Sequence, residues 1–414
     1  MNELTNSSFT ADQHTAVEMC LDLTQRIVSV TGEAGTGKTL VLSEITYVLE
    51  QRGIVYALCA PTGRAAARIR EVTKRRAQTC HRLLGFGSPD PSDPDDFTIP
   101  TRDRINPIPA SVVLVDESSM LSEDLYRALV DALRKNAAIR FFGDIRQLPP
   151  VNADDPPFRR LLEKFPKVIL TKNFRSGDGI VKAAQQINRG SIPTSNDKVK
   201  ILTISKQQGL SILDKFLDDD LFDQKKAQII TPTKIGKLGS EIINNYIQAK
   251  LNPTGPVMDL HFKDENEKTT SHIRVKRGDK ILWTKNDYNL NLMNGMIGNI
   301  VDFDPLEGAI AAEFEGRPII IPSHLEKFDD YNREIFAYDP RKFIDLAYAI
   351  TTHKSQGSEF DRVIIMLYWS SIGSRQNLYT ALTRGRKHVT IIAQQGGFKA
   401  FLKNDPSLEP REKK

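Results

Sequence analysis

The sequence predicts an α/β fold with two cores, each built on a parallel sheet. Short apolar runs rich in Val and Ile alternate with longer amphipathic stretches, which is the pattern of βαβ units. This alternation occurs early in the chain and again in its second half. The 414 residues are also enough for two to four domains of roughly 100–200 residues each.

The expected strands follow one another in the order that this fold requires. The runs are apolar throughout, as expected for parallel strands that are covered on both faces. Helical patterns over 40–52 and 64–76 separate the first three strands. The predicted strands of the first core are 27–30, 54–59, 112–115 and 139–142, and those of the second are 168–170, 228–231, 363–367 and 389–393.

Two stretches interrupt the alternation. Residues 85–109 are dense in Pro, Asp and Gly, which favours a hairpin or surface excursion. Residues 256–340 contain closely spaced short strands separated by Asn-Gly and Glu-Gly pairs, which predicts a small inserted β-barrel. Its expected strands are 280–284, 299–303, 310–314 and 318–322.

Composition limits the class of protein. Lys and Arg total 57 against 52 for Asp and Glu, and this net charge of +5 permits an anionic partner without indicating one. Three cysteines in so long a chain favour a reducing compartment. The sequence contains no apolar run of roughly 20 residues and no signal-peptide pattern at its start, so we expect a cytoplasmic protein that does not enter a membrane.

The strongest motif is a phosphate-binding loop, G-x-x-x-x-G-K-[ST], between a predicted strand and a helical stretch. Its glycines allow backbone N–H groups to curl around phosphate oxygens. Lys38 is expected to reach the β- and γ-phosphates of ATP, and the Thr39 hydroxyl to bind Mg²⁺. A chance glycine-rich turn is the alternative. The motif comprises Gly32, Glu33, Ala34, Gly35, Thr36, Gly37, Lys38 and Thr39.

Two further strand ends carry polar side chains where α/β sheets place ligands. Asp116 and Glu117 follow the strand 112–115, and we expect Asp116 to hold Mg²⁺ and Glu117 to polarise the attacking water. A solvated acidic helix cap is the alternative. Gln147, in the segment after the strand 139–142, can sense the γ-phosphate or the water, and a proline-terminated loop is the alternative there.

With these motifs the chain resembles the superfamily 1 DNA helicases of the RecD-like and Dda-like type. Six segments look like that family's motifs, in the family's order and over nearly the whole chain: 9–13, 60–66, 79–84, 170–176, 351–360 and 379–386. The resemblance implies two RecA-like lobes with ATP between them. It also implies that Gln13 contacts adenine, that Phe174 stacks on it in place of the more usual Tyr, and that Glu359 contacts the ribose. Arg175 and Arg384 would come from the second lobe and touch the γ-phosphate.

The resemblance also implies a domain map. The first lobe would comprise 1–84 and 110–165, with 85–109 as a hairpin that splits the duplex. The second lobe would comprise 166–255 and 341–414, with 256–340 as a barrel resembling an SH3 domain. The expected hairpin departs from the family because its apex, 89–96, has no aromatic residue, so that only Phe86 and Phe97 could serve as a base wedge.

Single-strand binders combine backbone contacts from hydroxyls and cations with aromatic stacking. We expect contacts from strand ends that face away from ATP: Pro61, Thr62 and His81 in the first lobe, and Thr233, Thr352 and His353 in the second. Thr231-Pro232-Thr233 parallels Ala60-Pro61-Thr62, which predicts one phosphate contact per lobe. The basic helical stretch 64–76 is more typical of a solvated face. A metal-binding role for His81 or His353 lacks a Cys/His cluster at ligand spacing.

The sequence thus predicts an ATP-dependent DNA helicase or translocase that uses Mg²⁺, and the resemblance implies movement 5′ to 3′. Its expected partners are single-stranded DNA and single/double-strand junctions, and we expect a monomer. A P-loop ATPase that remodels protein, or a nucleic-acid-binding module switched by ATP, are the alternatives. A role in DNA replication, repair or recombination fits the prediction, and the residues do not distinguish among them.

Overall fold

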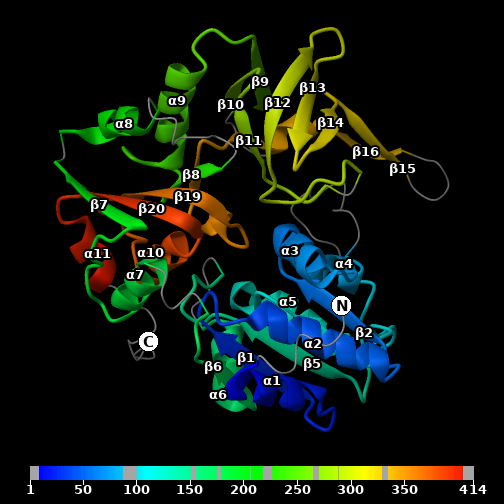
Figure 1. Ribbon diagram of the computed structural model, residues 1–414. Coiled ribbons are helices and arrows are strands. Elements are labelled where there is room, and N and C mark those ends of the chain that lie inside the picture. Colours follow the sequence, from blue (N-terminus) through cyan, green and yellow to red (C-terminus); the bar gives the residue numbers. More distant parts are fainter. Residues whose placement is uncertain are drawn as a thin grey trace, which may run out of the picture. The chain divides into compact units, whose positions relative to one another are not determined.

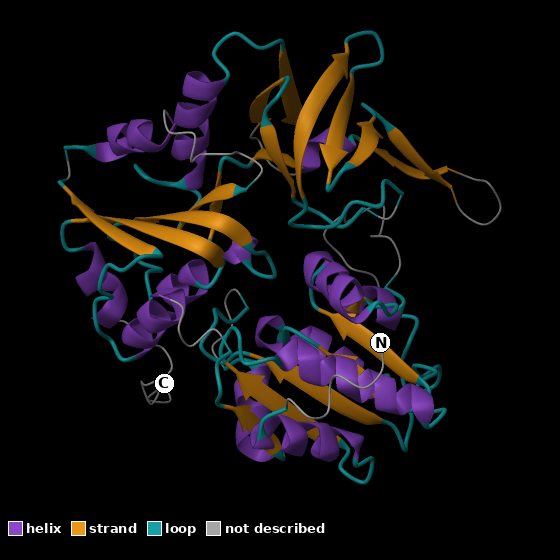
Figure 2. Cartoon of the chain, viewed as in Figure 1, coloured by secondary structure: helices purple, strands orange, loops and turns teal. Residues whose placement is uncertain are grey.

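The structure, a computed structural model, describes residues 9–86, 100–150, 155–174, 179–205, 207–217, 226–263, 270–287, 289–328 and 334–403. The chain divides into a first unit that ends at Pro193 and a second unit that begins at Thr194 (Figure 1). Both units combine strands and helices (Figure 2). None of the described helices combines the length and the apolar character that crossing a bilayer requires.

The first unit contains a six-stranded parallel sheet in the order β3-β2-β4-β5-β1-β6. Strand β4 is buried on both faces, because Val112 and Leu114 pack into one apolar cluster and Val113 and Val115 into another. The strands are β1 (Ile27–Gly32), β2 (Tyr56–Ala60), β3 (Gln78–Thr79), β4 (Val112–Val115), β5 (Ala138–Gly143) and β6 (Lys167–Leu170).

Helices cover both faces of this sheet. The first cluster draws its helical residues from α1 (Ala11–Leu21), α2 (Lys38–Gln51) and α3 (Gly63–Thr73). The second draws them from α4 (Cys80–Leu84), α5 (Glu123–Asp131) and α6 (Pro157–Lys164). Helix α7 (Gly179–Asn188) and the short η2 (Ser118–Met120) complete the unit. A parallel sheet that is covered in this way presents its loops at the strand ends, where ligands bind.

The second unit contains a five-stranded parallel sheet in the order β18-β8-β19-β20-β7. Its strands are β7 (Val199–Ile204), β8 (Ala227–Thr231), β18 (Ala349–Thr351), β19 (Phe360–Leu367) and β20 (Gly385–Gln394). The helical segments are η3 (Gly209–Leu213), α8 (Asp214–Leu217), α9 (Ser240–Leu251), η4 (Pro340–Phe343), η5 (His353–Ser355), α10 (Arg375–Leu382) and α11 (Gly397–Lys403).

The second unit also contains antiparallel strands, and none of the described ones pairs with the parallel sheet. Five strands form a sheet in the order β14-β13-β12-β11-β17, and two hairpins pair β9 with β10 and β15 with β16. They are β9 (Val257–Lys263), β10 (Thr270–Lys276), β11 (Lys280–Trp283), β12 (Ile297–Asp304), β13 (Ala309–Phe314), β14 (Arg317–Ile321), β15 (Leu325–Phe328), β16 (Glu334–Tyr338) and β17 (Ile344–Leu346).

Three boundaries differ from those expected from the sequence. Strand β6 was assigned to the second lobe, but it pairs with β1 and belongs to the first sheet. Strand β17 lies beyond the expected end of the insert at residue 340, yet it pairs with β11. Helix α7 also belongs to the first unit. The alternation of strands and helices identifies elements, but it does not reveal which sheet a strand joins, because pairing depends on contacts distant in sequence.

The expected hairpin at 85–109 is described only at its ends. Thr101 N donates to Gly85 O at 3.3 Å and Arg102 N donates to Leu84 O at 2.9 Å, so the two ends of the excursion lie side by side. Residues 87–99, which include the expected apex and Phe97, lie outside the described residues.

A buried carboxylate joins the antiparallel strands to the parallel part of the second unit. Asp279 is fully buried and accepts hydrogen bonds from Gln248 Nε2, from Asn252 Nδ2 at 2.9 Å, from Tyr348 OH at 2.9 Å and from Lys276 N at 2.7 Å. A buried charge is tolerated when donors surround it in this way. The network therefore fixes helix α9 and the residue before β18 against the start of β11.

Asp279→Ala is expected to lower the free energy of unfolding by about 3 kcal/mol, because it leaves several buried donors without an acceptor. Chemical denaturation measures this value. Asp302→Ala, at an exposed carboxylate in β12, is the control and should cost under about 0.5 kcal/mol. Equal stabilities of the two variants would show that the network does not hold the two parts together.

Candidate active site

The phosphate-binding loop joins the end of β1 to the start of α2. Gly35 and Gly37 have positive φ angles of 86° and 84°, which favour glycine, and Gly37 is the residue before the first turn of α2. A Cβ on Gly32 would lie 3.0 Å from Leu170 Cβ, so this position also favours glycine. The loop therefore has the backbone shape and the helix N-terminus that bind phosphate.

Lys38 lies over the loop that precedes it. Its Nζ donates to Gly32 O at 2.7 Å and to Glu33 O at 3.1 Å. The Thr36 hydroxyl donates to Glu33 O at 2.8 Å and stiffens the same turn. The ammonium is thus held within the curve of the loop, where the phosphate oxygens of a nucleotide would be stronger, charged acceptors.

The two predicted adenine contacts lie together at this loop. Gln13 is buried, and its Nε2 donates to Thr36 O at 3.1 Å. Phe174 N donates to Gly35 O at 3.1 Å, and the Phe174 side chain is half exposed. A Cβ on Gly37 would lie 2.5 Å from Gln13 Nε2 and 3.6 Å from the Phe174 ring. An amide and an aromatic face beside a phosphate loop are suited to a purine base.

Residues 171–174 donate hydrogen bonds to backbone carbonyls of the phosphate-binding loop. In addition to the Phe174 bond, Asn173 Nδ2 donates to Ala34 O at 2.8 Å. This segment lies in the first unit, so the expectation that the motif at 170–176 comes from the second lobe is wrong for its described residues. Arg175 itself lies outside the described residues. The strand that precedes it, β6, joins the first sheet, which explains the difference.

Asp12 at the start of α1 anchors the same segment. Its Oδ2 accepts from Thr171 N at 2.6 Å and from Thr171 Oγ1 at 3.0 Å. Burial tends to raise the pKa of Asp12, but hydrogen bonds from Thr10, Thr171 and Gln13 outweigh it and lower the pKa to about 2.

Asp12→Ala is expected to lower the free energy of unfolding by about 1–2 kcal/mol at pH 7, after a discount for solvent screening. A lowered pKa stabilises the fold above the unfolded pKa near 4 and loses that effect as the pH falls towards 2. The difference between variant and parent should therefore shrink between pH 4 and pH 2. Denaturation curves across this range test it, and a constant difference would contradict the assignment.

The acidic pair follows β4. Asp116 is buried, and its Oδ1 accepts from Glu117 N at 2.8 Å. Burial, followed by repulsion from Glu117, raises the pKa of Asp116 to about 7, and the positive charge of Lys38 opposes this rise. Glu117 has φ 52°, a left-handed conformation that is uncommon outside glycine and frequent at functional sites.

These groups fit a magnesium ion. Glu117 Oε2 is buried and has no hydrogen-bond partner among the described residues. A buried carboxylate beside a second carboxylate that has an unsatisfied buried oxygen gains from a divalent cation and its bound water. Asp116 and the Thr39 hydroxyl would hold the ion, while Glu117 would contact the water.

Gln147 lies in the loop after β5, as expected. It is buried, and its Oε1 has no hydrogen-bond partner among the described residues. The neighbouring Arg146 forms an ion pair with Glu33 of the phosphate loop, and Asn188 Nδ2 donates to the same carboxylate at 3.4 Å. The Glu33 carboxylate therefore binds Arg146 and Asn188, while its backbone carbonyl accepts hydrogen bonds within the phosphate loop. Sequence reasoning gave no role to Arg146, because no motif marks a contact between two loops.

In the second unit the predicted residues occupy opposite edges of the parallel sheet. Thr233, Thr352 and His353 follow β8 and β18, which are neighbours, at the carboxyl-terminal edge. Glu359 and Arg384 immediately precede β19 and β20, which are also neighbours, at the amino-terminal edge. The structure therefore separates the predicted nucleotide contacts of this unit from its predicted DNA contacts.

Arg384 is buried and held by acceptors of its own unit. Its guanidinium donates to Thr380 O at 3.0 Å, to Ser358 O at 3.3 Å and to Thr383 Oγ1 at 3.2 Å. Phe360 N donates to Arg384 O at 2.8 Å, which fixes Arg384 beside Glu359. The side chain is thus positioned by packing before any ligand is considered.

The predicted DNA contacts of the second unit differ in accessibility. The Thr233 hydroxyl donates to Ile235 O at 2.8 Å and also contacts Tyr368 OH. Thr352 is buried, and its hydroxyl donates to Asn377 Oδ1 at 2.9 Å, so in this structure it positions β18 rather than facing solvent. Burial lowers the pKa of His353, which favours the neutral imidazole.

The predicted DNA contacts of the first unit lie near the start of α3 and α4. Thr62 caps α3 by accepting from Ala65 N at 3.2 Å, and Pro61 before it is buried. Burial lowers the pKa of His81, whose ring meets that of Phe86 edge to face with centroids 5.2 Å apart.

The sequence predicts that Pro61 and Thr62 face away from the nucleotide loop. In the structure they lie at the same edge of the sheet as that loop. Strands β1 and β2 are parallel members of one sheet, so their carboxyl ends share an edge. Three strand spacings separate them, or roughly 14 Å at about 4.8 Å each. Asp116 N also donates to Cys59 O at 2.9 Å, so the acidic pair lies directly beside the Pro-Thr loop. The motif spacing could not show this, because it does not specify strand order.

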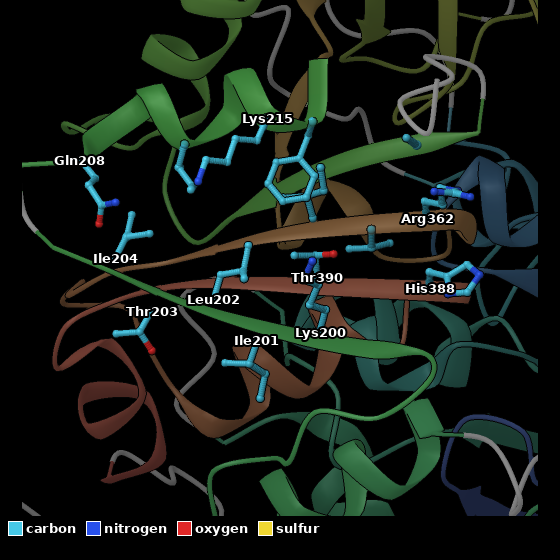
Figure 3. A pocket seen from close by; sticks show the side chains of 15 residues that line it. Lys200, Ile201, Leu202, Thr203, Ile204, Gln208, Lys215, Arg362, His388 and Thr390 are labelled. Carbon is cyan, nitrogen blue, oxygen red and sulfur yellow. The ribbon is translucent and has the colours of Figure 1, made fainter. Parts of the chain in front are cut away.

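The second unit also contains a cavity of about 510 Å³ that holds none of the predicted site residues. Figure 3 shows its lining side chains between the parallel sheet and the helical segment that carries Lys215. Its basic members are Lys200, Lys215, Arg362 and His388. We therefore assign it no part in the site described above.

Comparison with known proteins agrees with this arrangement. The family model described as an AAA domain matches residues 8–208, and the UvrD-like helicase C-terminal domain matches residues 346–392. Among solved structures, Bacteroides Pif1 bound to ssDNA covers 93% of this chain and 92% of its own, with a TM-score of 0.61 and 22% identity. Pif1 helicase from Candida albicans gives a TM-score of 0.59 at 18% identity and covers 93% of this chain and 94% of its own. These two likenesses show the two-lobe α/β fold.

Curated relatives are similar over most of the chain. The ATP-dependent RecD2 DNA helicase of Deinococcus radiodurans is 32% identical over 366 residues, which are 87% of this chain and 46% of RecD2. The RecD subunit of the RecBCD enzyme of Mycobacterium tuberculosis is 26% identical over 94% of this chain and 70% of its own length. The chain thus spans less than half of RecD2. Because the similarity to RecD2 extends over 87% of the chain, it supports the resemblance to the RecD-like superfamily 1 helicases.

Proposed function

We propose that this protein is an ATP-dependent DNA helicase or translocase that hydrolyses Mg-ATP and moves 5′ to 3′ on single-stranded DNA. The observation that carries the proposal is the first unit's sheet edge, where a phosphate loop with Lys38 occurs together with the buried Asp116 and its neighbour Glu117. A phosphate-binding loop, a metal ligand and a general base for the attacking water are the parts that phosphoryl transfer to water requires. The name of RecD2 and the DNA-bound Pif1 structure support DNA as the substrate.

In the proposed reaction, the N–H groups of the loop and Lys38 bind the phosphates, while Gln13 and Phe174 hold the base. Magnesium, held by Thr39 and Asp116, would neutralise charge on the β- and γ-phosphates. Glu117 accepts the proton of the attacking water as the water oxygen bonds to the γ-phosphorus and the bond to the ADP oxygen breaks. Its left-handed backbone, with φ 52°, is of the kind that clusters at active sites. Gln147 is placed to orient that water or to sense the γ-phosphate.

The second unit would contribute Arg384 to the γ-phosphate and Glu359 to the ribose, and we propose the same phosphate contact for Arg175. A planar guanidinium stabilises charge that spreads over the transferred phosphoryl oxygens. The opposite edge of the same sheet would bind DNA through Thr233 and His353. Both edges belong to one packed sheet. A movement of this sheet caused by nucleotide at one edge would therefore also displace the DNA contacts at the other edge.

We also propose roles for the remaining parts. Pro61, Thr62 and His81 would contact DNA in the first unit, and Thr352 would position its neighbours. The antiparallel strands of 256–346 would form an SH3-like insert, and 85–109 a pin that splits the duplex at a junction. The second lobe would then begin near Thr194 and not at residue 166. We propose that the protein acts as a monomer.

Single-stranded DNA is expected to stimulate ATP turnover at least about tenfold, because closing the catalytic site on the nucleotide would depend on DNA at the opposite edge. Steady-state phosphate release with and without an oligonucleotide measures this effect. Indifference to DNA would favour an ATPase that remodels protein. A single turnover without further release would favour a nucleic-acid-binding module that is switched by ATP.

A further inference from the structure

The loop that follows β19 presents a tryptophan to solvent. Trp369 is 73% exposed, whereas Trp283, the chain's other tryptophan, is fully buried. Ile372 in the same loop and Ile235 in the loop after β8 are also exposed, at 47% and 78%. Strands β8 and β19 are neighbours, so these side chains follow adjacent strands at one edge of the sheet.

A hydrogen bond ties the tryptophan's loop to a predicted phosphate contact. Tyr368, the residue before Trp369, places its hydroxyl against Thr233 Oγ1, and the same hydroxyl lies 3.4 Å from Thr231 Oγ1. Both threonines belong to the Thr-Pro-Thr segment that ends β8. Trp369 therefore directly follows a residue that is bonded to the position where Thr233 is proposed to contact a phosphate.

The charge of this edge suits a polyanion. Residues 231–240 contain Lys234 and Lys237 and no acidic residue, and residues 368–374 carry no charge. Across the edge, Asp345 forms ion pairs with Lys354 at 2.8 Å and with Lys234 at 3.6 Å. Asp345 thus pairs with two lysines, and Lys237 adds a third positive charge to these segments, so their net charge is positive.

We propose that Trp369 is a stacking platform for a base of single-stranded DNA, adjacent to the phosphate contact at Thr233. Single-strand binders pair cations that follow the backbone with aromatic faces that receive the bases. Hydroxyls, lysines and one exposed aromatic side chain occur together at this edge. This inference rests on the proposed function, since it assigns a base contact to the DNA edge of the second unit.

Intrinsic fluorescence tests the stacking directly in the full chain. Titration with a single-stranded oligonucleotide is expected to quench the emission of Trp369 as its ring stacks on a base. The buried Trp283 supplies the unquenched remainder, so Trp369→Phe should remove the response to DNA while preserving the fold. An independent readout, such as anisotropy of a labelled oligonucleotide, measures affinity at the same time.

Trp369→Ala is expected to weaken single-strand binding about tenfold, within the range that one stacked base contributes. Trp369→Phe should bind within about threefold of the parent because it retains an aromatic face. Ile372→Ala is the matched control for loss of an exposed apolar side chain from the same loop, and its affinity should be unchanged. An oligonucleotide of abasic sites should remove the difference between the parent and Trp369→Ala.

The outcomes separate this inference from the proposed function. Tight DNA binding with no quenching, or equal affinity of Trp369→Ala and the parent, would overturn the stacking role and leave the helicase proposal intact. Absence of single-strand binding by the parent would overturn both. Equal loss in Ile372→Ala and Trp369→Ala would show a general apolar contact and would also overturn stacking.

Discussion

Lys38→Ala is expected to reduce DNA-stimulated ATP hydrolysis by at least about 10²- to 10³-fold, the loss that follows removal of one preorganised group from a developing charge. In the structure the ammonium donates to Gly32 O and Glu33 O, within the curve of the phosphate loop. Alanine removes both these bonds and the cation that would meet the β- and γ-phosphates. Strand separation should disappear with the ATPase activity.

The fold should survive this change, because Lys38 contacts the loop and not the apolar core. Circular dichroism and thermal unfolding of the variant check this point. Lys135→Ala, at an exposed lysine in the turn before β5, is the matched control and should retain parental turnover. ATPase activity of Lys38→Ala near that of the parent would refute the assigned nucleotide site.

Arg384→Ala is expected to lower DNA-stimulated ATPase activity by roughly 10²-fold or more while binding ATP within about tenfold of the parent. Groups that meet charge built up in the transition state affect turnover more than ground-state binding. An arginine finger can contribute about 10³-fold or more to the rate of phosphoryl transfer, so a loss of roughly 10²-fold or more is a conservative expectation. The necessary measurements are a nucleotide-affinity titration and a steady-state ATPase assay.

The burial of Arg384 adds a structural consequence that the motif alone did not suggest. Removing the guanidinium leaves Thr380 O and Ser358 O without this donor, so the variant should also unfold at lower temperature. Arg384→Lys keeps the charge but lacks the planar fork, and it should still show a large loss of turnover. Arg386→Ala, an exposed neighbour paired with Asp361, controls for surface charge. Normal turnover by Arg384→Ala would refute its catalytic role.

Local motifs determined how much of the site could be predicted from the sequence. The phosphate loop and the Asp116–Glu117 pair are contiguous stretches whose chemistry depends on neighbouring residues, and the structure places both at the carboxyl ends of first-sheet strands. Gln13 and Phe174 are far apart in sequence, and the structure places both at the phosphate loop, although the sequence assigned Phe174 to the second lobe.

Contacts between distant segments were not predictable in this way. The membership of β6 in the first sheet depends on its pairing with β1, which no local pattern encodes. The carboxylate network of Asp279 joins residues from three elements, none of which has a motif. Trp369 was overlooked for a similar reason, since its significance comes from the contact between Tyr368 and Thr233.

Unwinding of tailed duplexes tests the central claim most directly. The parent protein with Mg-ATP should separate a duplex that carries a 5′ single-stranded tail, and it should leave a 3′-tailed duplex and a blunt duplex intact. Lys38→Ala should separate none of them. Failure of the parent to separate the 5′-tailed duplex, under conditions in which it hydrolyses ATP and binds the tail, would contradict the assignment of this protein as a 5′-to-3′ DNA helicase.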